Sequence, residues 1–443
     1  MSKLGGVFAP HLKNTAAFAP EAIPVPAEVK LPMSMHSGKA ANPVVNAGDL
    51  VKVGQLIGEA VGTVSSPVHA TVSGKVKSID TIDGNTGEKT ITVTITSDGE
   101  QTPWEGIAPP TVTNRDEFIE AVKNSGVVGL GGAGYPTAHK LMLKDYSKLD
   151  YILVNGAECE PYITSDTRTM VDNTDYVWDG IKLLKEYLTP KNIIICIEDN
   201  KQEPIKKFRE LCKNAKGISV RVLPSLYPQG ERKVLVYNVT SRIVPEGGRL
   251  PDVGCIVINC TTVSTIARYI RTGYPLVTKC VTVDGSAVKT PKNLVVPIGT
   301  PVRCLFDYCG GLKEDVKKIT LGGPMMGAAI PNMEVPVVKI TSALLAFSGR
   351  DAETPEPSNC IRCGRCINRC PMRLMPPNIE NAFELKKPEL LQKFKVNMCA
   401  ECACCAFTCP ARRPLVQVMT LAKNMLWHYE TAQKAAKEKK EAK

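Results

Sequence analysis

The sequence lacks three features that would each place it in a particular class of protein. None of its apolar runs approaches the roughly 18 to 20 residues that a membrane-spanning helix needs. Its first residues, MSKLGGVFAPHLKN, lack the apolar core and small-residue cleavage site of a signal peptide. No recognised RNA- or DNA-binding motif accompanies the formal net charge of +11, so nucleic acid is a weak candidate partner. We therefore expect a cytosolic protein whose positive charge suits an acidic protein partner or an anionic membrane surface.

Cysteine, by contrast, is abundant, although disulfides rarely persist in the cytosol. Of the 17 cysteines, nine lie between Cys360 and Cys409. The other eight are scattered through apolar segments such as NIIICIE and GCIVINC, where free cysteine behaves as a small buried hydrophobe. The clustered cysteines are therefore the candidates for chemistry.

These clustered cysteines repeat one spacing, C-x2-C-x2-C-x3-C-P, in CIRCGRCINRCP and in CAECACCAFTCP. In bacterial ferredoxins this run binds cubane [4Fe–4S] clusters, and its fourth cysteine ligates the other cluster. We therefore predict two [4Fe–4S] clusters, with Cys404 as a spare thiol. Zinc is a minor alternative, because its motifs use paired C-x2-C units. The predicted ligand sets are Cys360, Cys363, Cys366 and Cys409 for one cluster, and Cys399, Cys402, Cys405 and Cys370 for the other.

Changes in pattern along the chain predict an α/β multidomain protein with four domains. Residues 1–110 combine an irregular arm with a compact all-β module, since short apolar runs alternate with glycine over 43–79. This module resembles the barrel-sandwich of lipoyl and biotinyl domains, yet no lysine between Gln55 and Gly74 could carry a swinging arm. Residues 111–275 alternate strands and helices, as in an α/β layer fold. Residues 276–350 are β-rich, and residues 351–443 comprise a proline-containing linker, the cysteine runs and a C-terminal helix.

Within the α/β region, the apolar periodicity predicts individual elements. The expected helices cover 115–126, 136–145, 174–188, 204–215 and 262–273. The expected strands cover 151–155, 191–198, 219–224 and 255–259.

A glycine-rich stretch, VVGLGGAGYPTAHK, precedes the second of these helices. Glycines before a helix let backbone N–H groups approach a phosphate, which the helix dipole favours. The pattern is not the dinucleotide G-x-G-x-x-G, and a purely structural glycine turn is the alternative interpretation. The glycines concerned are Gly129, Gly131, Gly132 and Gly134.

The strand over 151–155 runs into a polar stretch, VNGAECEP. It places Asn155, Glu158 and Glu160 at the carboxyl edge of the predicted sheet, where ligands of α/β folds bind. A capped Asn-Gly turn is the alternative interpretation.

Together, GLGGAGYPTAHK and VNGAECEP resemble the flavin loop and acidic strand of the NADH-oxidising flavoprotein subunit of respiratory complex I. That subunit binds FMN and NADH beside an iron–sulfur cluster. The β module, YPQGERKVLVYNVT, GGRLPDVGCIVINCTTV and the doubled cysteine run extend the resemblance over nearly the whole chain. This longer resemblance is to the RnfC family, the C subunits of Rnf complexes. The Rnf complex is a membrane-associated ferredoxin:NAD+ oxidoreductase that pumps Na+ or H+.

The resemblance implies a β-grasp module in the third domain and a ferredoxin-like fold for the fourth. It also implies that FMN is bound non-covalently, with Asn155, Glu158 and Asn259 along the flavin. Tyr135 and Glu160 would face NAD(H). The phosphate and ribityl groups of FMN would be held by Gly129, Gly131, Gly132, Gly134 and Lys140.

Two positions depart from the family pattern. Arg232 stands two positions after the glycine of YPQG, where the family usually carries glutamate. Ala157 stands where the flavoprotein subunit has aspartate. Both departures fall in the expected NAD(H) pocket.

The family resemblance implies a peripheral subunit on the cytoplasmic face of the membrane. Electrons from ferredoxin would arrive by way of a partner subunit and pass through both clusters and FMN to NAD+, while other subunits translocate ions. Flavin provides the link between one-electron and two-electron carriers, so no side chain need act as general acid or base. One alternative is a soluble relative that feeds a proline reductase or a cobalamin reductase. Another is a scaffold whose clusters only stabilise the fold.

Overall fold

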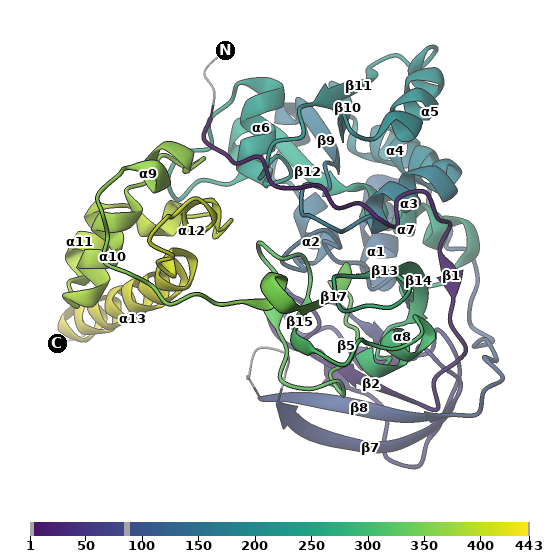
Figure 1. Cartoon of the computed structure of the whole chain (residues 1–443). Helices are drawn as coiled ribbons and strands as arrows, with labels where there is room; N and C mark the ends of the chain where they lie inside the picture. The colour runs from purple at the N-terminus through teal and green to yellow at the C-terminus, as the bar shows by residue number, and fades with distance from the viewer. Residues whose placement is uncertain (1–3, 84–88, 442–443) are drawn as a thin grey trace.

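The structure is a computed structural model that describes residues 4–83 and 89–441. Figure 1 shows the α/β part above the β-rich parts, with a helical C-terminal part beside them at the end of an extended linker. The N-terminal arm runs across the α/β part and ends at the β-rich part. Residues far apart in sequence therefore meet around the α/β part.

The N-terminal β part contains two sheets that share one apolar core. The strand orders are β2-β8-β7-β4 and β3-β5-β6. Alternate residues of β2, such as Val29 and Leu31, are fully buried, as expected for a strand with one face on a core. This confirms the predicted all-β module. The bounds are β2 (Glu28–Pro32), β3 (Asn42–Pro43), β4 (Leu50–Val51), β5 (Leu56–Glu59), β6 (Val68–His69), β7 (Gly74–Asp83) and β8 (Lys89–Ser97).

The α/β part contains a parallel sheet of order β11-β10-β9-β12. Three of its strands, β9, β10 and β12, are largely buried, whereas the edge strand β11 alternates with exposed residues. In β9, Ile152 and Val154 pack in the core with α4 (Thr174–Leu188) and α7 (Cys260–Thr272), whereas Leu153 packs with α6 (Arg232–Thr240). Such runs are typical of parallel strands that are covered on both sides. The strands are β9 (Tyr151–Gly156), β10 (Asn192–Glu198), β11 (Ile218–Leu223) and β12 (Cys255–Asn259).

The five predicted helices of this part are present, although α2 is shorter than expected, and the structure adds α3 and α6, which were not predicted. The helix α2 ends at Leu141 instead of continuing towards residue 145, because Met142 is extended and its N–H closes the last turn. The bounds are α1 (Arg115–Asn124), α2 (Thr137–Leu141), α3 (Ser165–Asp172), α4 (Thr174–Leu188), α5 (Gln202–Cys212), α6 (Arg232–Thr240) and α7 (Cys260–Thr272), with the short helices η1 (Tyr146–Lys148) and η2 (Leu250–Val253).

A mixed sheet of order β1-β14-β13-β17-β15-β16 forms the third part. The helix α8 buries Val302, Leu305 and Phe306 against this sheet. One edge strand, β1, comes from the N-terminal arm and pairs in parallel with β14, so the arm is not wholly irregular. The bounds are β1 (Glu21–Ala22), β13 (Thr278–Asp284), β14 (Lys292–Pro297), α8 (Val302–Tyr308), β15 (Val316–Leu321), β16 (Ala328–Ala329) and β17 (Ala343–Ser348).

The C-terminal part is helical, and its apolar core joins α10, α11 and α13. The long helix α13 runs beside α10 and α11, near the C-terminus (Figure 1). Within the described ranges, residues 4–83 and 89–441, no helix is long and apolar enough to cross a membrane. The bounds are η3 (Gly349–Ala352), α9 (Arg365–Arg369), α10 (Pro376–Glu384), α11 (Pro388–Lys393), η4 (Val396–Met398), α12 (Cys404–Phe407) and α13 (Leu415–Glu441).

Candidate functional site

The glycine loop lies against the N-terminus of α7. The Leu130 N–H donates to the Thr262 hydroxyl at 3.0 Å. A Cβ atom on Gly131 would lie 2.5 Å from Nδ2 of Asn259, so only glycine lets the loop approach this closely. Asn259 caps α7 by accepting hydrogen bonds from the N–H groups of Thr261 at 2.9 Å and Thr262 at 3.2 Å. Two helix N-termini therefore adjoin the loop. One is that of α7, and the other is that of the short α2, which the sequence indicated.

The other side of the loop is held by the two β-rich parts. The Ser37 N–H donates to the Gly134 carbonyl at 3.0 Å, and the Ser37 hydroxyl donates to Ala133. From β13, the buried Lys279 donates to the Leu130 carbonyl at 3.2 Å. Three parts of the chain thus fix one loop.

The tip of the loop is open. Around a Cβ atom built on Gly132, no described atom of the chain outside the neighbouring residues lies within 4 Å. Gly131 and Gly132 are both exposed. Tyr135 follows them in the sequence, and the centroid of its ring lies 5.6 Å from that of His139. A loop that is fixed behind and open in front is a shape that can receive a phosphate or a flat ring.

Lys140 lies next to this loop. A Cβ atom on Gly129 would be 3.6 Å from its Nζ, which donates to the Val257 carbonyl at 3.3 Å. Burial, together with the charge of Arg232, lowers the pKa of Lys140 to about 8. A buried ammonium group that donates to a neutral carbonyl can still gain from an anion. This environment fits the phosphate of FMN.

Asn155 and Asn259 end neighbouring strands and are opposite each other in the register of β9 and β12. Asn155 donates to the Gly230 carbonyl at 3.0 Å and accepts from the Ala157 N–H at 3.0 Å. It therefore ties the end of β9 to the YPQG segment. The structure brings both asparagines to the sheet edge where the glycine loop lies.

Glu158 is turned towards α3. Its carboxylate accepts from the Asp166 N–H at 2.7 Å and from the Thr167 hydroxyl at 2.7 Å. Burial raises the pKa of Glu158 to about 7. These bonds satisfy free N–H groups at the start of the helix, so in this structure Glu158 acts first as a helix cap.

Glu160 reaches the mixed-sheet part. It accepts from the N–H groups of Met325 at 3.0 Å and Met326 at 2.9 Å. Burial raises the pKa of Glu160 to about 7. The carboxylate therefore links the end of β9 to the loop between β15 and β16.

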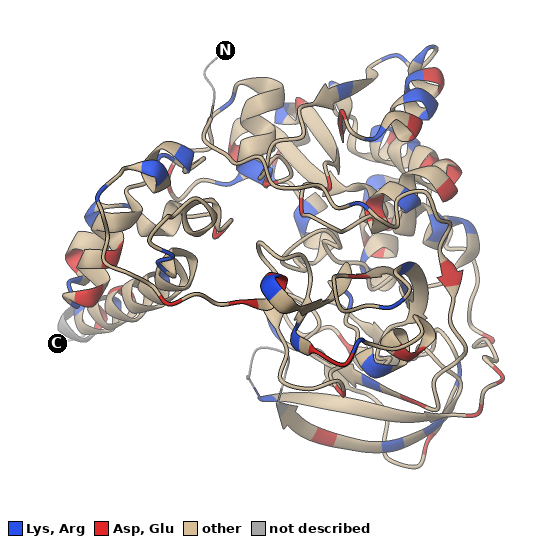
Figure 2. Ribbon diagram, in the orientation of Figure 1, with Lys and Arg blue, Asp and Glu red and all other residues tan. Residues whose placement is uncertain are grey.

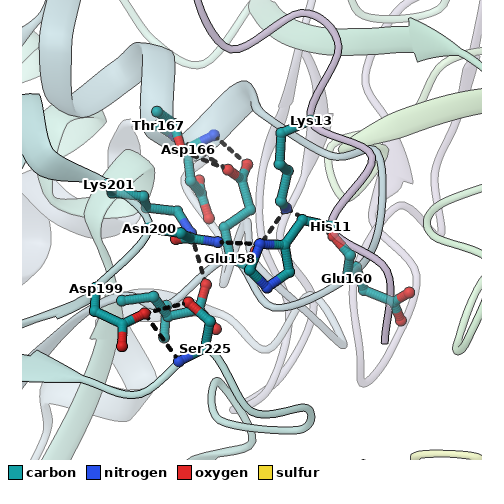
Figure 3. A network of polar contacts seen from close by, with 12 residues as sticks. His11, Lys13, Glu158, Glu160, Asp166, Thr167, Asp199, Asn200, Lys201 and Ser225 are labelled. Carbon is teal, nitrogen blue, oxygen red and sulfur yellow. Dashed lines mark hydrogen bonds and ion pairs between the residues drawn. The ribbon is translucent and has the colours of Figure 1, made fainter. Parts of the chain in front are cut away.

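Sequence reasoning missed Lys13, whose side chain enters this region from the N-terminal arm. Its Nζ donates to three carbonyls: Glu158 at 2.8 Å, Glu160 at 2.7 Å and Ile163 at 2.6 Å. Figure 3 shows Lys13 reaching in beside Glu158 and Glu160. Burial lowers the pKa of Lys13. The sequence offered one weak signal for this role of Lys13: the arm has no acidic residue close to it in sequence that could pair with it.

The cysteines of the two runs border two separate cavities. One cavity is lined by Cys370, Cys399, Cys402 and Cys405, and the other by Cys360, Cys363, Cys366 and Cys409. Cys404 lines neither cavity; it is fully buried and its thiol donates to the Tyr227 carbonyl at 3.8 Å.

Each cavity has four cysteines in its lining. In the described part of the chain, no three His, Cys, Asp or Glu side chains gather closely enough to hold one metal ion. A cubane has an iron at each of four corners, so its four thiolate ligands surround a volume. Four soft sulfur donors around one cavity suit an iron–sulfur cluster or zinc, and the ferredoxin spacing of the runs favours the cluster.

Comparisons with known protein families agree with this arrangement. Residues 1–100 match the RnfC barrel sandwich hybrid domain, residues 122–268 match the Nuo51 FMN-binding domain, and residues 280–329 match the SLBB domain. The matched ranges fall on the N-terminal β part, the α/β part and the mixed-sheet part.

Curated relatives cover most of the chain. The C subunit of the proton-translocating ferredoxin:NAD(+) oxidoreductase complex from Clostridium ljungdahlii is 39% identical, over 84% of this chain and 82% of its own length. The C subunit of the Na(+)-translocating complex from Acetobacterium woodii is 39% identical, over 85% and 86%. The C subunit of the ion-translocating oxidoreductase complex from Rhodobacter capsulatus is 37% identical, over 94% and 81%.

Among solved structures, a chain of the NAD+-reducing [NiFe]-hydrogenase in the air-oxidised state is similar, with a TM-score of 0.47 and 16% identity. The match covers 63% of this chain and 54% of the hydrogenase chain.

The fold and the FMN-domain match define the class: this is an oxidoreductase subunit with a flavin-binding α/β domain. Within that class, the chain belongs to the RnfC family, the C subunits of the ion-translocating ferredoxin:NAD+ oxidoreductase, or Rnf, complexes. The predicted family is therefore confirmed, and the soluble reductase-feeding alternative is not favoured.

Proposed function

We propose that this chain carries electrons between a ferredoxin-fed partner subunit and NAD+, using two [4Fe–4S] clusters and non-covalently bound FMN. The observation that carries the proposal is the pair of cysteine-lined cavities. The same chain has, in its α/β part, an open glycine loop with the ammonium group of Lys140 beside it. Ion translocation belongs to the whole complex in this scheme. The chain would then lie peripherally at the cytoplasmic face of the membrane, bound to other subunits.

When bound, FMN supplies the conversion between hydride transfer and single-electron transfer. The residues proposed to hold it are those gathered at the carboxyl edge of the parallel sheet. Lys140 and the loop N–H groups would hold the phosphate, with Asn155 and Asn259 at the ring system. Glu158 would act by fixing the start of α3, because its carboxylate already accepts bonds there.

The proposed NAD(H) contacts, Tyr135 and Glu160, flank the same region. Glu160 is engaged with the Met325–Met326 backbone, so its role towards NAD(H) includes holding the loop between β15 and β16 in place. The position of Arg232, exposed at the start of α6, gives this chain a cation where its family usually carries glutamate.

The two proposed clusters differ in their surroundings, which suggests their order. The loop that bears Cys402 packs in one apolar cluster with Tyr227 of the α/β part and Val7 of the arm. A Cβ atom on Gly5 would lie 2.5 Å from the Cys370 carbonyl oxygen, so the arm also touches this set of cysteines. In the other set, Cys360 and Cys363 are exposed. We call these the inner set (Cys370, Cys399, Cys402, Cys405) and the outer set (Cys360, Cys363, Cys366, Cys409), and place the inner set nearer to the flavin.

The proposed domain boundaries remain those indicated by the sequence, at residues 110, 275 and 350, although β1 of the first range pairs with β14 of the third. The SLBB match supports a β-grasp domain in the third part, and the cysteine spacing supports a ferredoxin-like fourth domain.

Anaerobic purification with cofactor analysis tests the proposal. We expect one FMN and about eight iron atoms per chain, since each complete four-cysteine run corresponds to one four-iron cluster. Bleaching of flavin absorbance by NADH should follow mixing. Stoichiometric zinc, about half the expected iron, or a preparation without flavin would contradict it.

A further inference from the structure

The outer set of cysteines lies at an open surface of the molecule. Cys360 and Cys363 are exposed, and between them Ile361 keeps 67% of its surface accessible. The cavity that these cysteines border is also lined by Arg362, Arg365 and Ile367. The inner set is different, because apolar residues such as Leu374, Val416 and Met419 close its cavity.

The surface around the outer set is strongly basic. From Pro357 to Ile379 the sequence contains four arginines and no aspartate or glutamate. Figure 2 shows Lys and Arg segments in blue on α9, which follows the first two cysteines of the run. Three of these arginines, Arg362, Arg365 and Arg369, are exposed, and Arg369 also donates to the Gly6 carbonyl of the arm at 3.4 Å.

The acidic residues nearest this cavity are neutralised by another arginine. Arg413 bonds to Glu380 at 2.8 Å and to Glu384 at 3.0 Å. The charge of Arg362, Arg365 and Arg369 is therefore not offset by the carboxylates that line the cavity.

These arginines are not explained by the negative charge of a cluster and its thiolates alone. The inner set would bear the same charge, yet among the described residues that line its cavity the one charged side chain is Glu401. Glu401 is itself paired with Lys423 at 2.5 Å. The difference between the two sets lies in exposure, so the arginines suit something that approaches from outside.

We propose that Ile361, Arg362, Arg365, Ile367 and Arg369 form the docking surface for an acidic electron-carrier domain that contains an iron–sulfur centre. This inference rests on the proposed function. A basic rim around two exposed isoleucines has the composition of a small, transient electron-transfer interface, in which polar residues surround an apolar centre. Opposite charge steers the carrier to the exposed edge of the outer cluster. One electron then leaves the carrier's iron–sulfur centre, which is oxidised, and reduces the outer cluster, with no atom transferred.

The test is anaerobic stopped-flow reduction of the cluster-loaded chain by a dithionite-reduced, acidic two-[4Fe–4S] ferredoxin, at several salt concentrations. For the wild type, the second-order rate constant should fall about tenfold or more as salt screens the attraction. The double variant Arg362→Glu/Arg365→Glu should be about tenfold slower at low salt, and its rate constant should no longer fall with salt. A matched control, Lys387→Glu/Lys393→Glu, makes the same charge change on exposed residues outside the cavity lining and should behave as the wild type.

Iron content, FMN content and flavin reduction by NADH are measured in each protein. Normal values in the arginine variant show that the proposed function holds and that only docking has changed; missing cofactor in the wild type would instead be a failure of the proposed function. Equal slowing of the variant and its lysine control, or an unchanged salt dependence, would overturn the docking surface. So would loss of binding to vesicles containing phosphatidylserine with normal ferredoxin kinetics, which would assign these arginines to a lipid surface.

Discussion

Replacement of Lys13 by methionine tests whether the N-terminal arm shapes the flavin site. Methionine keeps the length and apolar stem of lysine but removes three hydrogen bonds, to the carbonyls of Glu158, Glu160 and Ile163. Each buried acceptor left without a partner costs about 1 to 3 kcal/mol. Relief of the buried ammonium offsets part of that cost. We therefore expect the segment 157–164 to be destabilised by about 3 kcal/mol.

Two measurements follow this perturbation. Hydrogen exchange should show weaker protection in the segment, for example at the Tyr162 N–H, which donates to the His11 carbonyl at 3.0 Å. The affinity for FMN, followed by flavin fluorescence, should fall at least about tenfold, since about 1.4 kcal/mol of the lost energy suffices for that change. The half-exposed Lys52, which pairs with Glu105 at the surface, should change both quantities little when it is replaced by methionine in the same way. Wild-type protection and wild-type flavin affinity in Lys13→Met would refute this reasoning.

Three further predictions concern single side chains. Gly132→Val should fold and retain iron, because a Cβ atom there meets no described neighbour, but it should lose flavin as measured by fluorescence after denaturation. Cys404→Ser should leave iron content unchanged, whereas Cys405→Ser should lower it to about half by removing a ligand of one cluster. Burial raises the pKa of Glu160 to about 7. The contribution of Glu160 to folding stability is therefore complete below the ordinary pKa of a glutamate and is lost as the pH rises through about 7. The rate of flavin reduction by NADH should rise over the same pH window in stopped-flow traces, and Glu160→Gln should be flat with pH and about tenfold slower at high pH.

Local patterns in the sequence were sufficient for much of the fold. The helix α4 spans Thr174–Leu188, the bounds that its periodicity predicts, because Val177, Ile181, Leu184 and Leu188 all recur on one buried face. The four strands of the parallel sheet were also predicted, since β9, β10 and β12 are short, largely buried apolar runs and the edge strand β11 alternates apolar with exposed residues. The cysteine spacing groups the same cysteines that line each cavity, while their binding of clusters stays a prediction.

Contacts between distant segments had no such local signature. The arm looked irregular because the partners of β1 and of Lys13 lie more than a hundred residues away. Glu160 was assigned to NAD(H) from its place after β9, while the bonds it makes to Met325 and Met326 depend on how the mixed-sheet part packs against that strand end. Its role towards NAD(H) stays a prediction.

The central claim is that flavin connects NAD(H) to the clusters in a linear path, and one variant tests it most directly. Cys366→Ser removes a cysteine of the outer set, which we propose to lie at the end of the path away from the flavin. Anaerobic stopped-flow spectroscopy, following flavin and cluster absorbance separately, should show NADH bleaching the flavin at nearly the wild-type rate while electron flow to a ferredoxin-linked partner collapses. A Cys366→Ser protein that retains FMN and its fold yet cannot be reduced by NADH at the flavin would contradict the linear path.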